Sequence, residues 1–163
     1  MNNFINFLQE KEKGTYAAVL FEDSEEKVLY LKKIGIPNVN EDLHCTLIYS
    51  RKRCPNYEPM NMTDGEFYEE AIAYPDHLEI FKDKQGKNCL VLVLRSGWIV
   101  KRHKDITKEH GATHDYNEFI PHVTLSYDVE DFDFKSVEEQ LIKSDEFYKL
   151  VINKEYKEDL NEL

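Results

Sequence analysis

The feature that most constrains this chain is a six-residue pattern that occurs twice. The first copy, HCTLIY, begins at His44 and the second, HVTLSY, begins at His122, so both read His-x-Thr-Leu-x-Tyr. With six histidines and six threonines among 163 residues, His-x-Thr is expected by chance about 0.2 times, which measures the risk of a false match. A single copy would be interpreted as a surface or structural histidine. Two copies in so short a chain favour a functional pair.

Both copies are rich in β-branched and aromatic residues, which is typical of strands. Side chains at positions i and i+2 of a strand point to the same face. One face of each copy is therefore predicted to carry the imidazole and the hydroxyl: His44, Thr46 and Ile48 in the first, His122, Thr124 and Ser126 in the second. Tyr49 and Tyr127 are expected on the opposite faces. Two such strands side by side would direct two imidazoles and two hydroxyls into one cleft.

The length of 163 residues predicts one compact domain, residues 1–163, that is large enough to bury a core. The net charge is −11, with 32 acidic and 21 basic residues. That balance argues against binding of long DNA or RNA, which requires many contacts to phosphate. A small phosphate-bearing ligand in a local basic pocket is compatible with it.

Cysteine usage and hydropathy bear on the cellular location. The three cysteines form no CxxC pair and are odd in number, which indicates a reducing, cytoplasmic setting. The apolar runs are shorter than a membrane span, and the N-terminal FINFL is too short for a signal-peptide core. We therefore expect a cytoplasmic protein with neither a membrane partner nor an obligate protein partner.

The order of predicted elements indicates an α+β fold. Apolar periodicity and breakers predict strands at 13–21, 43–50, 67–82, 88–95, 122–127 and 146–156, and helices at 2–12, 23–34, 96–110 and 135–143. Ser96 is the expected N-cap of the third helix. The segment 51–66, rich in turn-forming residues, is predicted to be a long loop. We expect two similar lobes, each a small antiparallel sheet backed by helices, with one motif per lobe facing a central cleft.

Two imidazoles across a cleft can serve as general base and general acid, because histidine titrates near neutral pH. A phosphodiester beside a ribose 2′-hydroxyl suits such a pair, and threonine hydroxyls can stabilise the charge that develops on phosphate oxygens. A metal site is the weaker alternative, since His110 and His114 have helical ligand spacing but are separated by Gly111. We therefore predict neither a metal nor another cofactor. A cysteine nucleophile is also disfavoured, because Cys45 is expected to point away from the His44 face.

The paired His-x-Thr-hydrophobic strands resemble those of the 2H phosphoesterase superfamily. The resemblance implies two pseudo-symmetric lobes around the cleft. It also implies that His44 and His122 are the acid–base pair and that Thr46 and Thr124 bind the phosphate.

The segments KGTYAAVLF near the start and NKEYKEDL near the end are similar to the bacteriophage anti-CBASS phosphodiesterases of this superfamily. Those enzymes degrade the cyclic di- and trinucleotide signals of bacterial antiphage immunity. The resemblance implies that Tyr16 contacts the nucleotide and that Glu155 assists catalysis. The alternatives are a buried aromatic at position 16 and a solvated charge at position 155.

Two further residues are candidate substrate contacts. Trp98 lies near several basic residues and would stack on a base, although a core tryptophan on a helix face is the commoner case. Arg51 begins the run RKR and would bind a second phosphate; a solvated loop is the alternative.

Together with the residue features, the resemblance to the anti-CBASS phosphodiesterases implies a metal-independent phosphodiesterase that cleaves 3′–5′ bonds of cyclic oligonucleotides such as cyclic GMP–AMP. It would allow immune evasion within the infected bacterial host if the chain is phage-encoded. One alternative is a 2H enzyme acting on 2′,3′-cyclic phosphate ends of RNA or on 2′–5′ oligoadenylates. Another is a non-catalytic protein that sequesters cyclic nucleotides.

Overall fold

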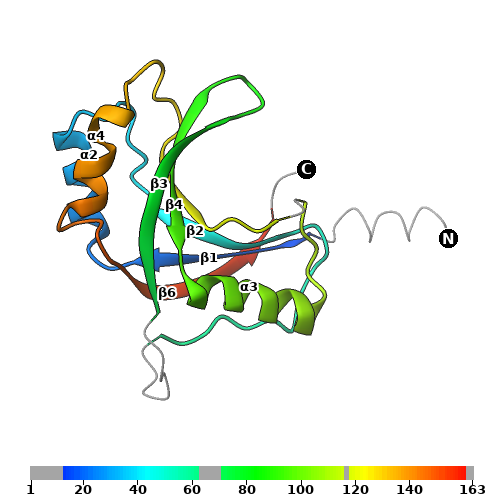
Figure 1. The fold of residues 1–163 in the computed structure, drawn as a ribbon. Helices are drawn as coiled ribbons and strands as arrows, with labels where there is room; N and C mark the ends of the chain where they lie inside the picture. The colour runs from blue at the N-terminus through cyan, green and yellow to red at the C-terminus, as the bar shows by residue number, and fades with distance from the viewer. Residues whose placement is uncertain (1–12, 63–70, 116–117, 161–163) are drawn as a thin grey trace.

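The computed structural model describes residues 13–62, 71–115 and 118–160 (Figure 1). These residues form six strands and three helices. The strands are β1 (Thr15–Phe21), β2 (His44–Ser50), β3 (Ile72–Lys82), β4 (Asn88–Arg95), β5 (His122–Ser126) and β6 (Leu150–Asp159). The helices are α2 (Ser24–Lys33), α3 (Gly97–His110) and α4 (Lys135–Lys143). The helix predicted at 2–12 and the first residues of the strand predicted at 67–82 lie outside the described residues.

The strands form one closed sheet in the order β1-β2-β5-β4-β3-β6, and each neighbouring pair is antiparallel. The predicted α+β class is therefore confirmed. The prediction of two small sheets is not, because the motif strands β2 and β5 pair directly at Cys45↔Val123. On the other side, β3 pairs with β6 at Ile72↔Val151, which closes the sheet.

The connectivity repeats across the direct pairing of β2 with β5. One unit runs β1-α2-β2 and the other runs β4-α3-β5, and each ends on the strand that carries a motif. The repeated sequence motif is thus accompanied by a repeated strand–helix–strand unit. It is this arrangement that brings the two motifs onto adjacent strands.

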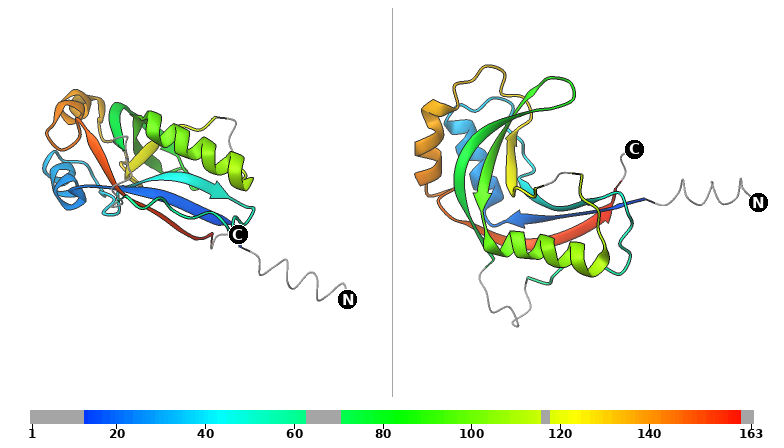
Figure 2. Two further views of the ribbon diagram at one scale, coloured as in Figure 1. Left: turned by 90° about the horizontal axis from the view of Figure 1, so that it is seen from below. Right: turned by 45° about the vertical axis from the view of Figure 1, so that its right-hand side comes forward.

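The helices cover two separate parts of the sheet. Figure 2 shows α2 and α4 side by side at one end, away from α3. Helix α3 begins as predicted, because the Ser96 hydroxyl accepts a bond of 3.1 Å from the backbone N–H of Ile99. Its buried residues are Ile99, His103 and Ile106, which recur at helical spacing and face the sheet. His103, the histidine among these buried residues, packs against β2, the strand of the first motif.

Strand β2 contains an extra residue within the motif. Its register against β1 steps from Ala17↔Ile48 to Ala18↔Thr46, so Leu47 forms a β-bulge. A bulge reverses the alternation of side chains beyond it. Ile48 is consequently buried in the core, while Tyr49 joins Thr46 in lining a cavity. The predicted faces of Ile48 and Tyr49 were therefore wrong.

The second motif has the same bulge at the equivalent position. The register of β5 against β4 steps from Leu90↔Ser126 to Val91↔Thr124, which makes Leu125 the extra residue. Ser126 is completely buried instead of facing the cleft, and its hydroxyl donates to the Pro37 carbonyl at 2.7 Å. The two motif strands thus carry equivalent bulges, and beyond the first of them Tyr49 lies on the Thr46 side.

Candidate active site

The two motif histidines are held in the same way. The Nδ1 atom of His44 lies 2.8 Å from the carbonyl oxygen of Asp42, and the Nδ1 atom of His122 lies 2.8 Å from that of Ile120. A carbonyl only accepts, so Nδ1 carries the hydrogen in both rings. The neutral ring then holds its lone pair on Nε2, the atom that a general base uses. Each histidine is oriented by the carbonyl two residues before it.

Thr46 is held by a tyrosine from the neighbouring strand. The Tyr16 hydroxyl and the Thr46 Oγ1 atom are 2.9 Å apart, and the Tyr16 ring lies 6.4 Å from that of His44. Burial raises the pKa of the Tyr16 phenol above its ordinary value, so this hydroxyl keeps its proton at neutral pH. The structure thus places Tyr16 beside the first motif, and its contact with a ligand remains a prediction.

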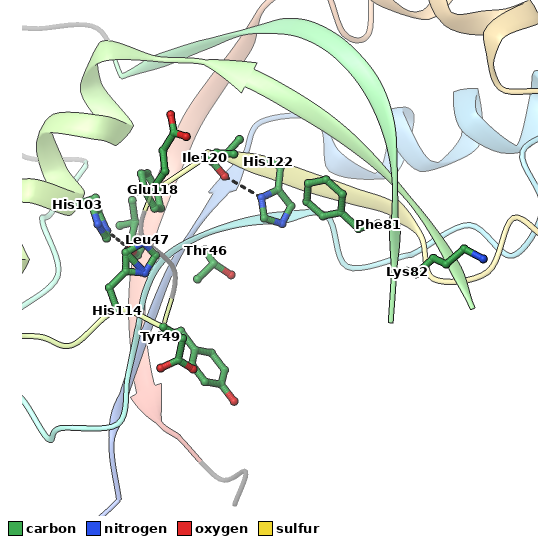
Figure 3. A pocket seen from close by; sticks show the side chains of 12 residues that line it. Thr46, Leu47, Tyr49, Phe81, Lys82, His103, His114, Glu118, Ile120 and His122 are labelled. Atoms are coloured by element: carbon green, nitrogen blue, oxygen red, sulfur yellow. Dashed lines mark hydrogen bonds between the residues drawn. The ribbon is translucent and has the colours of Figure 1, made fainter. Parts of the chain in front are cut away.

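A cavity of about 550 Å³ opens beside the motifs, with Thr46 and His122 in its lining (Figure 3). Most of the remaining wall is apolar or aromatic. Phe81 meets the His122 ring edge to face at 5.3 Å, and Tyr49 lies on the Thr46 side. Lys82, Asp115 and Glu118 contribute charged groups to the lining. A flat ring system with polar edges matches this combination of aromatic walls and charged groups.

The far wall of the cavity is built around His103. Its ring stacks on Phe119 with centroids 3.9 Å apart and planes 5° apart, and it meets His114 at 5.0 Å. Its Nδ1–H donates to the carbonyl of Leu47, the bulged residue, at 2.7 Å. Burial lowers the pKa of His103 below its ordinary value and keeps the ring neutral. The sequence analysis missed this residue, although its position between Ile99 and Ile106 on the buried stripe was the signal.

Comparison with known proteins gives a clear result. Residues 13–163 match the family model described as "Anti-CBASS protein Acb1". The chain belongs to this family. The Acb1 protein of Enterobacteria phage T4 is 34% identical over 151 residues, covering 90% of this chain and 88% of the relative. That of Salmonella phage S16 is 31% identical over 156 residues, covering 93% and 97% respectively. The Acb1 protein of Vibrio phage KVP40 is 32% identical over 122 residues.

In this Acb1-family chain, Glu155 is not the solvated charge that the sequence analysis gave as the alternative, and its assistance to catalysis remains a prediction. Its side chain is fully buried and accepts from Arg102 Nε at 2.7 Å and Nη2 at 2.8 Å. It also accepts from the Tyr57 hydroxyl and from the Met60 N–H. The next residue, Tyr156, has its ring 6.4 Å from that of Tyr16. Alternation along β6 therefore puts Tyr156, which was not predicted, on the motif side and Glu155 on the α3 side.

The other two predicted contacts lie at different distances from the cavity. Arg51 is largely exposed and forms an ion pair with Asp115, at 3.2 Å between Nη2 and Oδ2. Asp115 lines the cavity, whereas Arg51 is not among the described residues that line it. Trp98 is partly buried against the core, and it is absent from the described residues that line the cavity. Its placement matches the alternative of a core tryptophan.

Two negative observations concern only residues 13–62, 71–115 and 118–160 of this Acb1-family chain. Within them, no group of three or more histidine, cysteine, aspartate or glutamate side chains could hold a metal ion. Over the same ranges, none of the helices has the length and apolar character that a membrane crossing demands.

Proposed function

We propose that this chain is a phosphodiesterase that hydrolyses 3′–5′ bonds of cyclic di- and trinucleotides and thereby blocks CBASS signalling. The observation that carries the proposal is the equivalent seating of His44 and His122 on adjacent strands, each with Nδ1 bonded to the carbonyl two residues earlier. The names of its phage relatives support the anti-CBASS role. The two strand–helix–strand units then correspond to the two lobes of a single 2H phosphoesterase-like domain.

The reaction proceeds in two steps with exchanged roles. In the first, the neutral Nε2 of one histidine takes the proton of the ribose 2′-hydroxyl, whose oxygen attacks the phosphorus. The protonated Nε2 of the other histidine gives its proton to the departing 5′-oxygen, leaving a 2′,3′-cyclic phosphate. In the second, the first histidine returns a proton to the 2′-oxygen while the other takes one from water, which yields a 3′-phosphate. These steps require no metal ion.

The threonines stabilise the charge that develops on the phosphate. Because Tyr16 stays protonated, it can donate to the Thr46 oxygen at 2.9 Å. The Thr46 hydroxyl hydrogen is then available to a non-bridging phosphate oxygen. Thr124 occupies the same position in the second motif and acts on the opposite side of the phosphate.

The cavity beside Thr46 and His122 favours a nucleotide of small size. Its volume of about 550 Å³ accommodates a nucleoside next to the scissile phosphate, and its aromatic walls offer stacking surfaces. The acidic Asp115 and Glu118 and the net charge of −11 disfavour a long polyanionic chain. A cyclic di- or trinucleotide meets both conditions.

The test is incubation of the purified protein with 3′,3′-cyclic GMP–AMP in EDTA, followed by mass spectrometry. The wild type is expected to give a linear dinucleotide. His44→Ala and His122→Ala should each be slower by about 10²–10⁴-fold. His77→Ala is the matched control, because His77 is an exposed strand histidine bonded to Asp76 and Glu79.

Three outcomes would contradict the proposal. Recovery of intact ligand after tight binding would indicate sequestration. Cleavage that is abolished by EDTA would require a metal. Cleavage of 2′–5′ oligoadenylate or of 2′,3′-cyclic phosphate ends, with the cyclic dinucleotide left intact, would assign the chain to another substrate class.

A further inference from the structure

Asn40 lies between the two motifs, on the segment that joins α2 to β2, and only 9% of it is exposed. Its backbone N–H donates to the carbonyl of Leu125 at 2.8 Å. Its side-chain Nδ2 donates to the carbonyl of Thr124 at 2.9 Å and to that of Asp42 at 2.9 Å. Its Oδ1 accepts from the Asp42 N–H at 3.0 Å. The buried amide thus uses both its donor and its acceptor.

These bonds connect the two motifs in a continuous path. The Asp42 carbonyl that accepts from Asn40 also accepts the Nδ1–H of His44, at 2.8 Å. The path runs from the Thr124 backbone through the Asn40 amide to the Asp42 carbonyl, and from there to the His44 ring. A histidine of the first copy is therefore oriented by a carbonyl that is itself tied to the second copy.

The two β-bulges explain why hydrogen bonds between the two motifs are needed. A bulge interrupts the ladder and leaves the carbonyl of the extra residue in need of another donor. At Leu125 that donor is the Asn40 N–H, which comes from the first strand–helix–strand unit. At Leu47 it is the His103 ring, which comes from the second unit. The bulged carbonyl of each strand–helix–strand unit is thus hydrogen-bonded by a donor from the other unit.

We infer that Asn40 is a positioning residue, which fixes the His44 ring relative to the strand that carries Thr124. The inference rests on the proposed function for its effect on turnover, because it assigns His44 to proton transfer. Its effect on the orientation of the His44 ring is independent of any activity. Asn40 itself touches no reacting atom.

The decisive variant is Asn40→Asp, which has almost the same shape. It keeps an oxygen acceptor for the Asp42 N–H but replaces the Nδ2 donor with an oxygen that faces two carbonyls. Asn38→Asp is the matched control, since the exposed Asn38 lies on the same segment and its Nδ2 donates to the Asp128 carbonyl at 2.8 Å. The chemical change is identical, but the Asp128 carbonyl accepts from neither motif histidine.

Two measurements test the inference. With cyclic GMP–AMP as substrate, Asn40→Asp should lower kcat by about 10- to 100-fold, because small errors in the position of a catalytic group have costs of this order. KM should change by less than about threefold, because Asn40 lines no part of the cavity among the described residues. In the free protein, side-chain nitrogen NMR should show His44 as the Nδ1–H tautomer in the wild type and as a mixture of tautomers in Asn40→Asp. His122 should be unchanged, and Asn38→Asp should match the wild type in both measurements.

A wild-type tautomer of His44 in folded Asn40→Asp would overturn the inference, whatever the activity. If the wild type cleaves none of the tested nucleotides, the proposed function fails, and the NMR result still decides the role of Asn40. Should Asn40→Asp fail to fold, Asn40→Ser provides the same test, because it keeps one donor and introduces no charge. A Tm loss in either variant with kcat and tautomer intact would indicate a merely structural role and would also overturn the inference.

Discussion

Replacement of Glu155 by Gln separates a structural from a catalytic role for this buried carboxylate. The partners that surround it, namely the Arg102 guanidinium, the Tyr57 hydroxyl and the Met60 N–H, all act as donors. A carboxylate has two oxygens with which to accept these bonds. The glutamine amide has one oxygen, and its NH₂ group would face donors. The substitution therefore leaves donors unpaired and removes the ion-pair partner of Arg102, whose side chain is 14% exposed.

The expected loss follows from this geometry. Removing one partner of a buried ion pair costs about 3–5 kcal/mol in the free energy of unfolding. For a chain of this size each kcal/mol corresponds to about 2–4 °C, so the Tm should fall by roughly 10 °C. Thermal and urea unfolding measure the loss, and kcat is determined well below the Tm of the variant. We expect kcat to be retained, because Glu155 lies on the opposite side of β6 from Tyr156 and the motifs.

Glu139→Gln is the matched control, since Glu139 forms an exposed ion pair with Lys143 and should leave the Tm unchanged. An unchanged Tm in Glu155→Gln together with a collapse of kcat would refute the argument. Glu155 would then assist catalysis, as the sequence analysis expected.

Three other perturbations have clear expectations. Burial lowers the pKa of His103, so below about pH 6.5 the unfolded chain takes up a proton before the folded one does. This histidine therefore contributes stability above that pH that is lost on acidification, and His103→Phe should flatten the dependence of urea unfolding between pH 5 and 7. Gly14→Ala would place a methyl group in a clash with the backbone oxygen of Ser50, so a loss of about 1–3 kcal/mol in the free energy of unfolding is expected in thermal unfolding. Burial raises the pKa of Cys45 to about 12, so a thiol reagent at pH 8 should modify partly exposed Cys89 and reach Cys45 only after unfolding; rapid modification of Cys45 would contradict its burial.

The sequence predicted the parts of the structure that depend on local patterns. The duplicated motif placed both histidines on strands, because repeated chemistry at strand spacing is a local signal, but the direct pairing of these two strands was not predicted. The start of α3 was predicted correctly, since Ser96 is a strong N-cap and its hydroxyl does accept from Ile99. Strand alternation likewise predicted the core positions of Cys45 and Leu47.

The failures involve contacts between segments that are distant in sequence. The bulges at Leu47 and Leu125 arise from pairing with β1 and β4, and the motif letters alone give no sign of them. The burial of Glu155 could not be read from its own segment, because it depends on Arg102, which lies on α3 far along the chain. The role of Asn40 also depends on a distant contact, because its amide bonds to Thr124 as well as to nearby Asp42.

The pairing between β2 and β5 affects the local opening of the sheet. Within these described strands the register rests on the single pair Cys45↔Val123, whereas the neighbouring pairings extend over several residues. Fewer residue pairs therefore join β2 to β5, the strands that carry the two histidines, than join either strand to its other neighbour. A ligand that contacts both histidines would stabilise the pairing of β2 with β5. Amide hydrogen exchange in both strands should therefore slow when the ligand binds. Under the proposed function, substrate binding and the pairing of β2 with β5 are therefore coupled.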